Sequence, residues 1–401
     1  MPCLQDSTNN RQRAPLAVYI HIPFCPSKCG YCDFNSYGMG ADGKRGLSPD
    51  LIPKTVAAIC DEIEQSPYQG WPSKTIFFGG GTPTYLAPSQ LRQILQKVQE
   101  VHPPIERCEI TTEANPGTVD AEKFVALHSL GFNRISIGVQ SFQDDELVRL
   151  GRVHRASEAE VAYTAAKNAG FDNVNLDLMF ALPGQAIKRW ASNLQRALAL
   201  QPQHLSLYCL TIEAGTAFSK QLQSGKLNDL PSHDDQAEMF ELARELTQSH
   251  GYENYEISNF AQNGFQCQHN LAYWNAEYYA GYGPGAVAFL PLLSEPNHPK
   301  STIGVRRTNL KHPSQYCTAV LNHQTLELER EEITASIHET ERIMLGLRLS
   351  CGLDLQTLSI PKEKIDQVIR FHWAKVIEDR LILTPLGQAL CTEVTIYLMG
   401  N

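Results

Sequence analysis

The chain has 401 residues, of which 42% are hydrophobic and 19% charged. This length allows two or three domains, and the composition is that of an ordinary globular protein rather than a disordered or fibrous one. Long uncharged stretches are interrupted by Gly and Pro, so no transmembrane segment is predicted. The first fifteen residues are polar and lack an apolar core, which also argues against a secretory signal.

The charge is unevenly distributed along the chain, which has a formal net charge of −9. Residues 1–230 hold 21 Lys and Arg against 22 Asp and Glu, whereas residues 231–401 hold 13 against 21. A protein that neutralises many phosphates would show a basic surplus. The composition therefore argues against nucleic acid as a partner.

The chain contains 11 cysteines, an odd number, in a sequence without a recognisable secretory signal. Such thiols are typical of the reducing cytosol, where clustered cysteines indicate a metal site or catalysis rather than a disulfide framework. A cytoplasmic location is therefore predicted.

The first 250 residues alternate β-rich runs with amphipathic helical stretches. Strands are predicted at 16–22, 74–78, 109–114, 134–139, 173–181 and 204–211, and helices near 53–65, 89–102, 120–130, 157–169, 188–200 and 233–249. Six consecutive β-then-α units predict parallel strands joined by right-handed crossovers. Six units are too few for a closed eight-stranded barrel, so an open partial barrel and a doubly wound sheet both remain possible.

The pattern changes after about residue 250. Residues 252–316 show no strong period, a long helical pattern begins near 331, and a second helix is predicted near 362–378. A short strand and a last helix opened by Pro385 follow, which together resemble a small winged-helix unit. The negative charge favours a packing or interaction module over a DNA-binding one. The predicted divisions are a polar tail (1–15), an α/β barrel unit (16–250), an irregular connection (251–330) and a C-terminal helical module (331–401).

Three cysteines follow the first predicted strand in a C-x3-C-x2-C spacing: Cys25, Cys29 and Cys32. Thiolates this close on a loop can hold three corners of a [4Fe–4S] cluster and leave one iron open for a ligand. A structural zinc site normally needs four ligands, and no second pair of Cys or His is nearby. The spacing therefore predicts an iron–sulfur cluster.

Other candidate site residues follow the later strands. The run Gly79-Gly80-Gly81-Thr82 lacks the features of a phosphate-binding loop, but its glycines would allow a ligand to approach the backbone closely. Single polar residues stand at or just past the ends of the next strands: Glu113, Gln140, Arg152 and Asp177. The carboxyl ends of barrel strands are where an active site is expected.

The cysteine loop at the end of the first strand of a βα series resembles the radical S-adenosylmethionine (SAM) superfamily. The resemblance implies an α/β fold: a partial (β/α)6 barrel, followed here by a smaller α-rich, winged-helix-like C-terminal module. In that superfamily the open iron binds the amino and carboxylate groups of SAM. One electron from the cluster then cleaves SAM to a 5′-deoxyadenosyl radical, while the protein binds, orients and excludes water.

The sequence contexts of the polar residues are similar to those of the oxygen-independent coproporphyrinogen III oxidase group, from about Tyr19 to the C-terminus. By position, the resemblance implies that SAM is contacted by Tyr19, Tyr31, Gly80, Gly81, Thr82, Glu113, Gln140, Arg152, Asp177 and Cys209.

Two departures separate this sequence from the oxidases and resemble the HemW family of proposed heme chaperones. The oxidases carry a further cysteine where Phe34 stands here, and they have a longer segment before the first strand. A third feature is an H-N-x-x-Y-W motif formed by His269, Asn270, Tyr273 and Trp274, which in that family is associated with heme. Histidine can ligate heme iron, and aromatic rings can cover a porphyrin face. Cys267 is a rival ligand.

The leading hypothesis is a heme-trafficking protein that binds one [4Fe–4S] cluster, SAM and heme, and passes heme to an acceptor protein. An electron donor is needed if the cluster is redox active. The sequence does not identify the heme acceptor, the electron donor, a catalytic residue or the oligomeric state. The alternative is anaerobic oxidative decarboxylation of coproporphyrinogen III, which Phe34 argues against. A third, remote hypothesis is a zinc-binding interaction protein with a winged-helix tail.

Overall fold

The computed structural model describes residues 14–39, 47–293 and 301–400. Almost all of the predicted polar tail lies outside these ranges. Within them, none of the helices combines the length and the apolar character that crossing a membrane requires.

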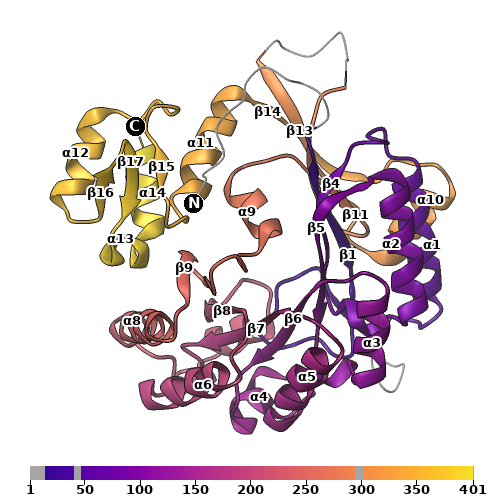
Figure 1. Ribbon diagram of the computed structural model, residues 1–401, viewed down its shortest axis with the longest axis horizontal. Coiled ribbons are helices and arrows are strands. Elements are labelled where there is room, and N and C mark those ends of the chain that lie inside the picture. Colours follow the sequence, from indigo (N-terminus) through magenta and orange to yellow (C-terminus); the bar gives the residue numbers. More distant parts are fainter. Residues whose placement is uncertain (1–13, 40–46, 294–300, 401) are drawn as a thin grey trace.

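Six parallel strands form the centre of the molecule (Figure 1). They pair in chain order as β1 (Leu16–Ile22), β4 (Ser73–Gly80), β5 (Pro104–Ala114), β6 (Arg134–Gln140), β7 (Asn173–Phe180) and β8 (His204–Cys209). The connecting segments contain α1 (Leu51–Glu64), α2 (Pro88–Val101), α3 (Ala121–Ser129), α5 (Ala156–Asn168) and α6 (Ile187–Ala199), and α8 (His233–Ser249) follows β8. The predicted partial (β/α)6 barrel is confirmed.

The strands have two different faces because side chains alternate along them. In β1, Leu16, Val18 and Ile20 are fully buried in the main hydrophobic core. Tyr19, between two of these core residues, points to the opposite face, where its ring lies near the rings of Phe77 and His269. The barrel therefore has an apolar outer layer under the helices and an inner face that carries polar and aromatic groups.

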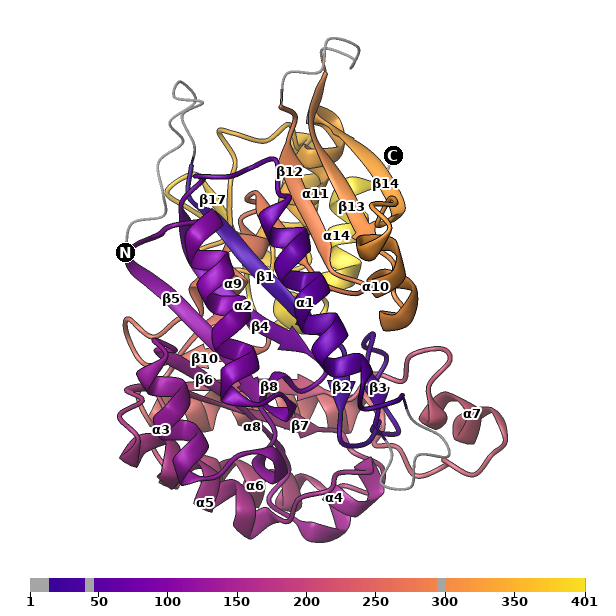
Figure 2. The ribbon, with the colours of Figure 1, turned by 90° about the vertical axis from the view of Figure 1, so that its right-hand side faces the viewer.

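The sheet continues on both sides of the barrel strands. Its twelve strands include β9 (Glu253–Glu256), β10 (Asn259–Ala261), β11 (Tyr279–Tyr282), β12 (Val287–Pro291), β13 (Thr302–Asn309) and β14 (Glu327–Thr334). β10 pairs antiparallel with β8, whereas β11 lies parallel to β1 on the opposite side of the barrel and leads to β12–β14 (Figure 2).

The prediction of an irregular connection over 251–330 is therefore wrong, and the sheet crosses the predicted boundary at 250. Strands β10 and β11 pair with the distant strands β8 and β1, and strands β13 and β14 carry several charged residues, so this region lacks a continuous hydrophobic period. Arg306 of β13, for example, lies opposite Glu331 of β14 and forms an ion pair with it at 2.8 Å.

The C-terminal module has its own hydrophobic core, which includes Ile343, Val368 and Leu381. It consists of α11 (Ala335–Gly346), β15 (Leu353–Asp354), α12 (Lys362–Arg370), β16 (Ala374–Ile377), β17 (Arg380–Leu383), α13 (Pro385–Ala389) and α14 (Cys391–Met399). The three strands form an antiparallel sheet in the order β15-β17-β16, and helices pack around it as in a winged helix.

Two predicted helices in this module are shorter than expected. The first begins only at Ala335, because the hydroxyl of Thr334 caps it by accepting the Ile337 N–H at 3.3 Å, while residues 331–334 belong to β14. The second ends at Arg370, because residues 374–377 pair with β17 instead.

Candidate functional site

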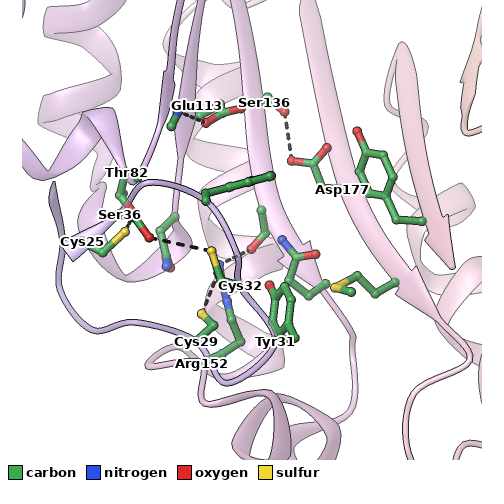
Figure 3. A pocket seen from close by; sticks show the side chains of 18 of the residues that line it. Cys25, Cys29, Tyr31, Cys32, Ser36, Thr82, Glu113, Ser136, Arg152 and Asp177 are labelled. Carbon is green, nitrogen blue, oxygen red and sulfur yellow. Dashed lines mark hydrogen bonds between the residues drawn. The ribbon is translucent and has the colours of Figure 1, made fainter. Parts of the chain in front are cut away.

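A cavity of about 380 Å³ opens at the carboxyl ends of the barrel strands (Figure 3). Most of the predicted site residues line it: Cys25, Cys29, Tyr31, Cys32, Gly80, Gly81, Thr82, Glu113, Gln140, Arg152 and Asp177. The structure thus brings together side chains from the cysteine loop and from the ends of β4, β5, β6 and β7.

The cysteine loop is held at both ends by short strands. β2 (Phe24–Cys25) pairs with β3 (Tyr37–Gly38), and the middle of the loop is fixed where the Gly30 N–H donates to the Leu150 carbonyl at 3.1 Å. The loop therefore has a defined backbone path, with both ends and the middle held by hydrogen bonds.

Each of the three thiols has at least one polar neighbour in this cavity. Thr82 Oγ1 lies 3.5 Å from Cys25 Sγ, a guanidinium nitrogen of Arg152 lies 3.7 Å from Cys29 Sγ, and Ser36 Oγ lies 3.7 Å from Cys32 Sγ. Hydroxyl and guanidinium donors of this kind stabilise sulfur that carries negative charge. The neighbourhood is therefore suited to thiolate ligands.

The thiol chemistry fits a bound iron–sulfur cluster. Burial raises the pKa of Cys25 to about 11 and also raises the pKa of Cys32, so without a metal these thiols are protonated. A metal ligand must lose this proton, and the metal then compensates the charge. No three His, Cys, Asp or Glu side chains in the described ranges converge closely enough for a single ion, whereas three thiols around one cavity suit a polynuclear cluster.

The glycine run packs against the cysteine loop. The N–H groups of Gly81 and Thr82 donate to carbonyls of Ile22 and Phe24, each at 2.8 Å. A Cβ atom at Gly81 would lie 2.7 Å from the Phe24 carbonyl oxygen, so any other residue would displace the loop. The glycine run was predicted to let a ligand approach its backbone closely. In the structure, Gly81 lets the backbone of the cysteine loop approach closely instead.

Gly80 has a second role, because its φ of +107° favours glycine and its N–H donates to Glu113 Oε2 at 3.1 Å. Burial raises the pKa of Glu113 to about 8, with the nearby Asp177 adding to the effect. Asp177 itself accepts hydrogen bonds from Ser136 Oγ at 3.0 Å and from the Asn175 amide at 2.8 Å. Two carboxyl groups thus face the cavity, and a cationic ligand would favour their ionised form.

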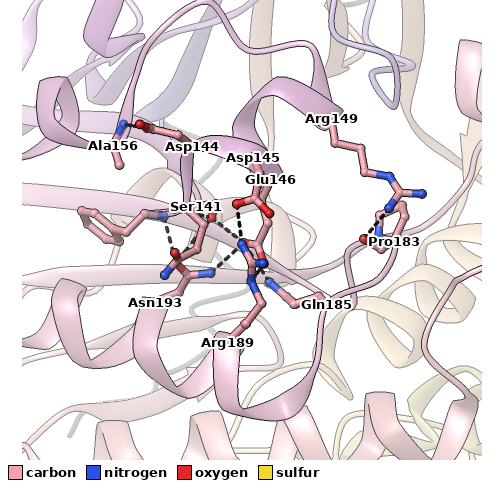
Figure 4. Close-up of polar contacts among 12 residues, drawn as sticks. Ser141, Asp144, Asp145, Glu146, Arg149, Ala156, Pro183, Gln185, Arg189 and Asn193 are labelled. Atoms are coloured by element: carbon pink, nitrogen blue, oxygen red, sulfur yellow. Dashed lines mark hydrogen bonds and ion pairs between the residues drawn. The ribbon is translucent and has the colours of Figure 1, made fainter.

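Gln140 is the last residue of β6, and Arg152 follows α4 (Asp144–Leu150) in the next segment. The φ of Gln140 is +65°, and Arg152 donates to the Gly138 carbonyl at 2.6 Å. A buried network around Glu146 fixes this segment to α6, with hydrogen bonds from Ser141, Gln185 and Asn193 and an ion pair with Arg189 (Figure 4).

Two predicted SAM contacts do not line the cavity in this conformation. The hydroxyl of Tyr19 lies 3.0 Å from His21 Nδ1, deeper inside the barrel. Cys209, the last residue of β8, has its sulfur 3.7 Å from Gln236 Oε1. Their contact with SAM stays a prediction.

The H-N-x-x-Y-W motif occupies α9 (Gln268–Trp274), which lies between the barrel and the C-terminal module (Figure 1). His269 is 1% exposed, and its ring stacks on Phe77 at 4.9 Å between centroids. Its Nδ1 is 2.7 Å from Thr75 Oγ1 and its Nε2 is 3.2 Å from the hydroxyl of Tyr273. Burial lowers its pKa to about 3, so the ring is neutral.

His269 therefore does not fit as an axial heme ligand in this conformation, because both ring nitrogens are engaged inside the barrel. The rival ligand Cys267 is equally inaccessible: it is fully buried, and burial raises the pKa of its thiol to about 12. The other motif residues point elsewhere. Asn270 lines the cavity, and the ring of Trp274 lies under the guanidinium of Arg348 at 4.4 Å.

Sequence reasoning missed the polar residues inside the barrel. The cavity is also lined by Arg134, Ser136 and Asn175, which lie deeper along the strands, and by Ser206 and Tyr208 of β8. Alternation is the signal that could have found them, because every second position of 134–138, 173–177 and 204–208 belongs to this face. Strands with one apolar face under the helices and one polar face inside the barrel indicate a polar barrel interior.

Comparison with known proteins agrees with this site. Residues 19–196 match the family model of the radical SAM superfamily. The chain is 34% identical over 385 residues to a protein of Bacillus subtilis named heme chaperone HemW, covering 95% of this chain and 94% of the relative. It is 43% identical over 274 residues to heme chaperone HemW of Escherichia coli, covering 68% of this chain and 69% of the relative.

The fold is also that of a solved structure, the radical SAM enzyme coproporphyrinogen III oxidase (HemN) of Escherichia coli. The TM-score is 0.80 with 21% identity, over 97% of this chain and 92% of the other. Radical SAM membership implies a [4Fe–4S] cluster and SAM, and the thiol-lined cavity is compatible with both. By its likeness to these relatives, which extends over nearly the whole length of the Bacillus subtilis protein, the chain belongs to the HemW family of the radical SAM superfamily.

Proposed function

We propose that this protein binds heme and transfers it to an acceptor protein, using a barrel that holds one [4Fe–4S] cluster and SAM. The observation that carries this proposal is the 34% identity, over 95% of the chain, to a relative named as a heme chaperone. The protein then needs an acceptor for heme and, if its cluster changes oxidation state, an electron donor.

In this proposal Cys25, Cys29 and Cys32 hold the cluster beside the SAM cavity. When bound, the cluster supplies the electron that can cleave SAM. The protein's own residues bind and orient SAM: Glu113 and Asp177 offer carboxylates to its cationic and hydroxyl groups, and Arg152 offers a cation next to Cys29. The proposed set of SAM contacts is completed by Tyr19, Tyr31, Gly80, Gly81, Thr82, Gln140 and Cys209.

The alternative function is anaerobic oxidation of coproporphyrinogen III. An enzyme of that function has the same fold, so the fold does not distinguish it from heme transfer. The distinguishing position is Phe34, which lines the mouth of the cavity with 61% of its surface exposed. An apolar ring here supplies neither the ligand chemistry nor the polarity of the oxidase cysteine. This favours heme handling over porphyrinogen decarboxylation.

The heme site is not assigned to His269, whose ring nitrogens are both hydrogen-bonded. Heme binding through His269 would require α9 to leave the barrel interior. Binding elsewhere on the surface requires no such opening, and the proposal does not depend on which histidine is used.

An optical titration of the anaerobically reconstituted protein with heme, with and without SAM, tests the proposal. We expect saturable binding of about one heme per chain, followed by transfer to a colourless heme-free globin added as a reporter. The same preparation should not convert coproporphyrinogen III to protoporphyrinogen IX under reducing, anaerobic conditions with SAM. Repeated turnover of porphyrinogen would favour the oxidase instead, and absence of saturable heme binding would refute the proposal.

A further inference from the structure

One arginine inside the barrel is charged and buried, and it has no partner among the residues that the structure describes. Arg134, the first residue of β6, is 2% exposed and lines the cavity. Its guanidinium makes no hydrogen bond or ion pair with any residue of the described ranges, and its Nε atom is buried without a partner. Buried arginines are almost always paired, because removing the charge from water is costly. The structure therefore leaves a cation that requires an acceptor.

The second arginine of the cavity shows the contrast. Arg152 already donates to the Gly138 carbonyl at 2.6 Å and lies 3.7 Å from Cys29 Sγ, so its position is explained by the protein and by the cluster loop. The guanidinium of Arg134 carries five donor N–H groups in a planar fork, and no side chain in the part of the chain that the structure describes accepts from them.

The carboxylates in the same interior are already committed to other donors. Glu109 accepts the backbone N–H groups of Gln268 and His269 at 3.0 and 3.2 Å, which fixes the start of α9. Asp177 accepts from Ser136 and Asn175, and Glu113 accepts from Gly80. The carboxylates of Glu109 and Asp177 attract Arg134 from a distance, but neither forms an ion pair with it.

The surroundings of Arg134 also leave polar groups open. Its two neighbours across the sheet, Thr111 of β5 and Asn173 of β7, each have a buried side-chain oxygen without a partner. Asn270 of α9 lines the same cavity, and its helix is anchored to the barrel through the contact of His269 with Thr75 of β4. His269 is thus a positioning residue that presents the Asn270 amide to the cavity.

We infer that Arg134 binds a carboxylate group of a ligand in this cavity, with the amide of Asn270 as a second donor. The planar guanidinium matches a carboxylate with two parallel hydrogen bonds, and such charge-assisted bonds are strong in a buried site. The inference rests on the proposed function, which supplies two carboxylate-bearing ligands. Heme carries two propionates, and SAM carries one carboxylate, which the open cluster iron binds in the radical SAM superfamily.

Binding measurements on the cluster-loaded, full-length protein test this inference. Arg134→Gln should weaken binding of the carboxylate ligand about ten- to hundred-fold, the loss expected for a charge-assisted hydrogen bond. SAM is measured beside decarboxylated SAM, and heme beside heme dimethyl ester, because the second member of each pair lacks the carboxylate. Arg244→Gln, on α8 and paired with Glu241, is the matched control and should bind all four ligands like the wild type.

The ligand pairs distinguish the two carboxylate sources. Loss of SAM affinity, with decarboxylated SAM bound equally by wild type and variant, assigns Arg134 to SAM. Loss of heme affinity, with the dimethyl ester unaffected, assigns it to a propionate. Unchanged affinity for both carboxylate ligands would overturn the inference while leaving the proposed function intact. If the wild type fails to bind heme, the proposed function fails, and the SAM pair still tests Arg134.

A second variant covers the case in which Arg134→Gln does not fold or loses its cluster. Asn270→Ala removes a partly exposed amide and should weaken the same ligand about two- to tenfold, as loss of a neutral hydrogen bond predicts. Wild-type affinity for SAM and heme in Asn270→Ala, with normal iron content, would then contradict the proposed subsite.

Discussion

The cysteine loop and helix α9 carry the two most distinctive motifs of this chain, and they differ in how their polar atoms are used. The three thiols of the loop line an open cavity, and each has at least one polar neighbour there. His269 on α9 is buried, with both ring nitrogens engaged by the protein. A motif that leaves its donor atoms facing a cavity can hold a ligand, whereas a motif that satisfies them internally holds the structure together.

The largest expected effect is on the loop. Cys25→Ala, Cys29→Ala or Cys32→Ala should each abolish the ~4 Fe per chain expected of one cluster, because no other thiol of the described residues lines this cavity. Iron and sulfide analysis of anaerobic preparations measures the loss. Cys391→Ala, in the C-terminal module, is the control and should retain its iron. Full iron content in Cys29→Ala would contradict the assignment of Cys29 as a cluster ligand.

The second largest effect is expected at helix α9, where a substitution should change stability rather than ligand binding. His269→Ala should lower the free energy of unfolding by about 2–4 kcal/mol, because it empties a buried site and leaves Thr75 without its partner. Heme affinity and the Soret band should stay unchanged in the fraction that remains folded. Denaturant unfolding and heme titration are the two measurements.

The matched control for that variant is His233→Ala, an exposed histidine at the start of α8. A fully stable His269→Ala protein with a shifted Soret band would show that the ring is a heme ligand after all. The contrast between loop and helix would then be wrong.

A third prediction concerns pH and Glu113 in the cluster-free protein. Its pKa is raised from 4.5 to about 8 by burial, so the folded state holds a proton that the unfolded state releases at lower pH. As the pH rises from 4.5 to 8, the free energy of unfolding of the wild type should therefore fall relative to that of Glu113→Gln. The fall is at most about 1.4 kcal/mol per pH unit. Parallel stability curves for the two proteins across this range would show that Glu113 is ionised throughout.

The smallest effect is expected at the junction of α9 with the C-terminal module. Trp274→Phe keeps an aromatic ring under Arg348 but weakens the cation–π contact, so the unfolding free energy should fall by about 1 kcal/mol or less. Cluster content should not change, because Trp274 does not line the cavity. Loss of iron in this variant would mean that the junction and the cysteine loop are coupled.

The sequence predicted the parts of the fold that have local signals. The six βα units and the cysteine loop follow from short-range periodicity and spacing, and both agree with the structure. Strands β9–β14 were not predicted, because several of them are short or carry charges and two, β10 and β11, join the sheet through partners far away along the chain. β11, for example, pairs with β1 across more than 250 residues of sequence.

The same distinction holds for the site. The residues at the strand ends were found by position, whereas Arg134 lies at the start of its strand and has no motif around it. His269 was placed in a cofactor site by its motif, but its environment depends on Thr75 and Phe77 of β4, which no local pattern connects to it. Burial and pairing of polar atoms require the tertiary structure.

The pairing of β11 with β1 has a consequence for biosynthesis. β1 leads directly into the cysteine loop, yet one of its two edges has no partner until Tyr279–Tyr282 has been made. While the chain is being synthesised, this strand presents unpaired backbone N–H and C=O groups beside the future cluster, a state prone to aggregation. A chain terminated near residue 250 would keep that edge permanently. The six-strand unit should therefore be less soluble alone than the full-length protein, although it contains every cluster ligand.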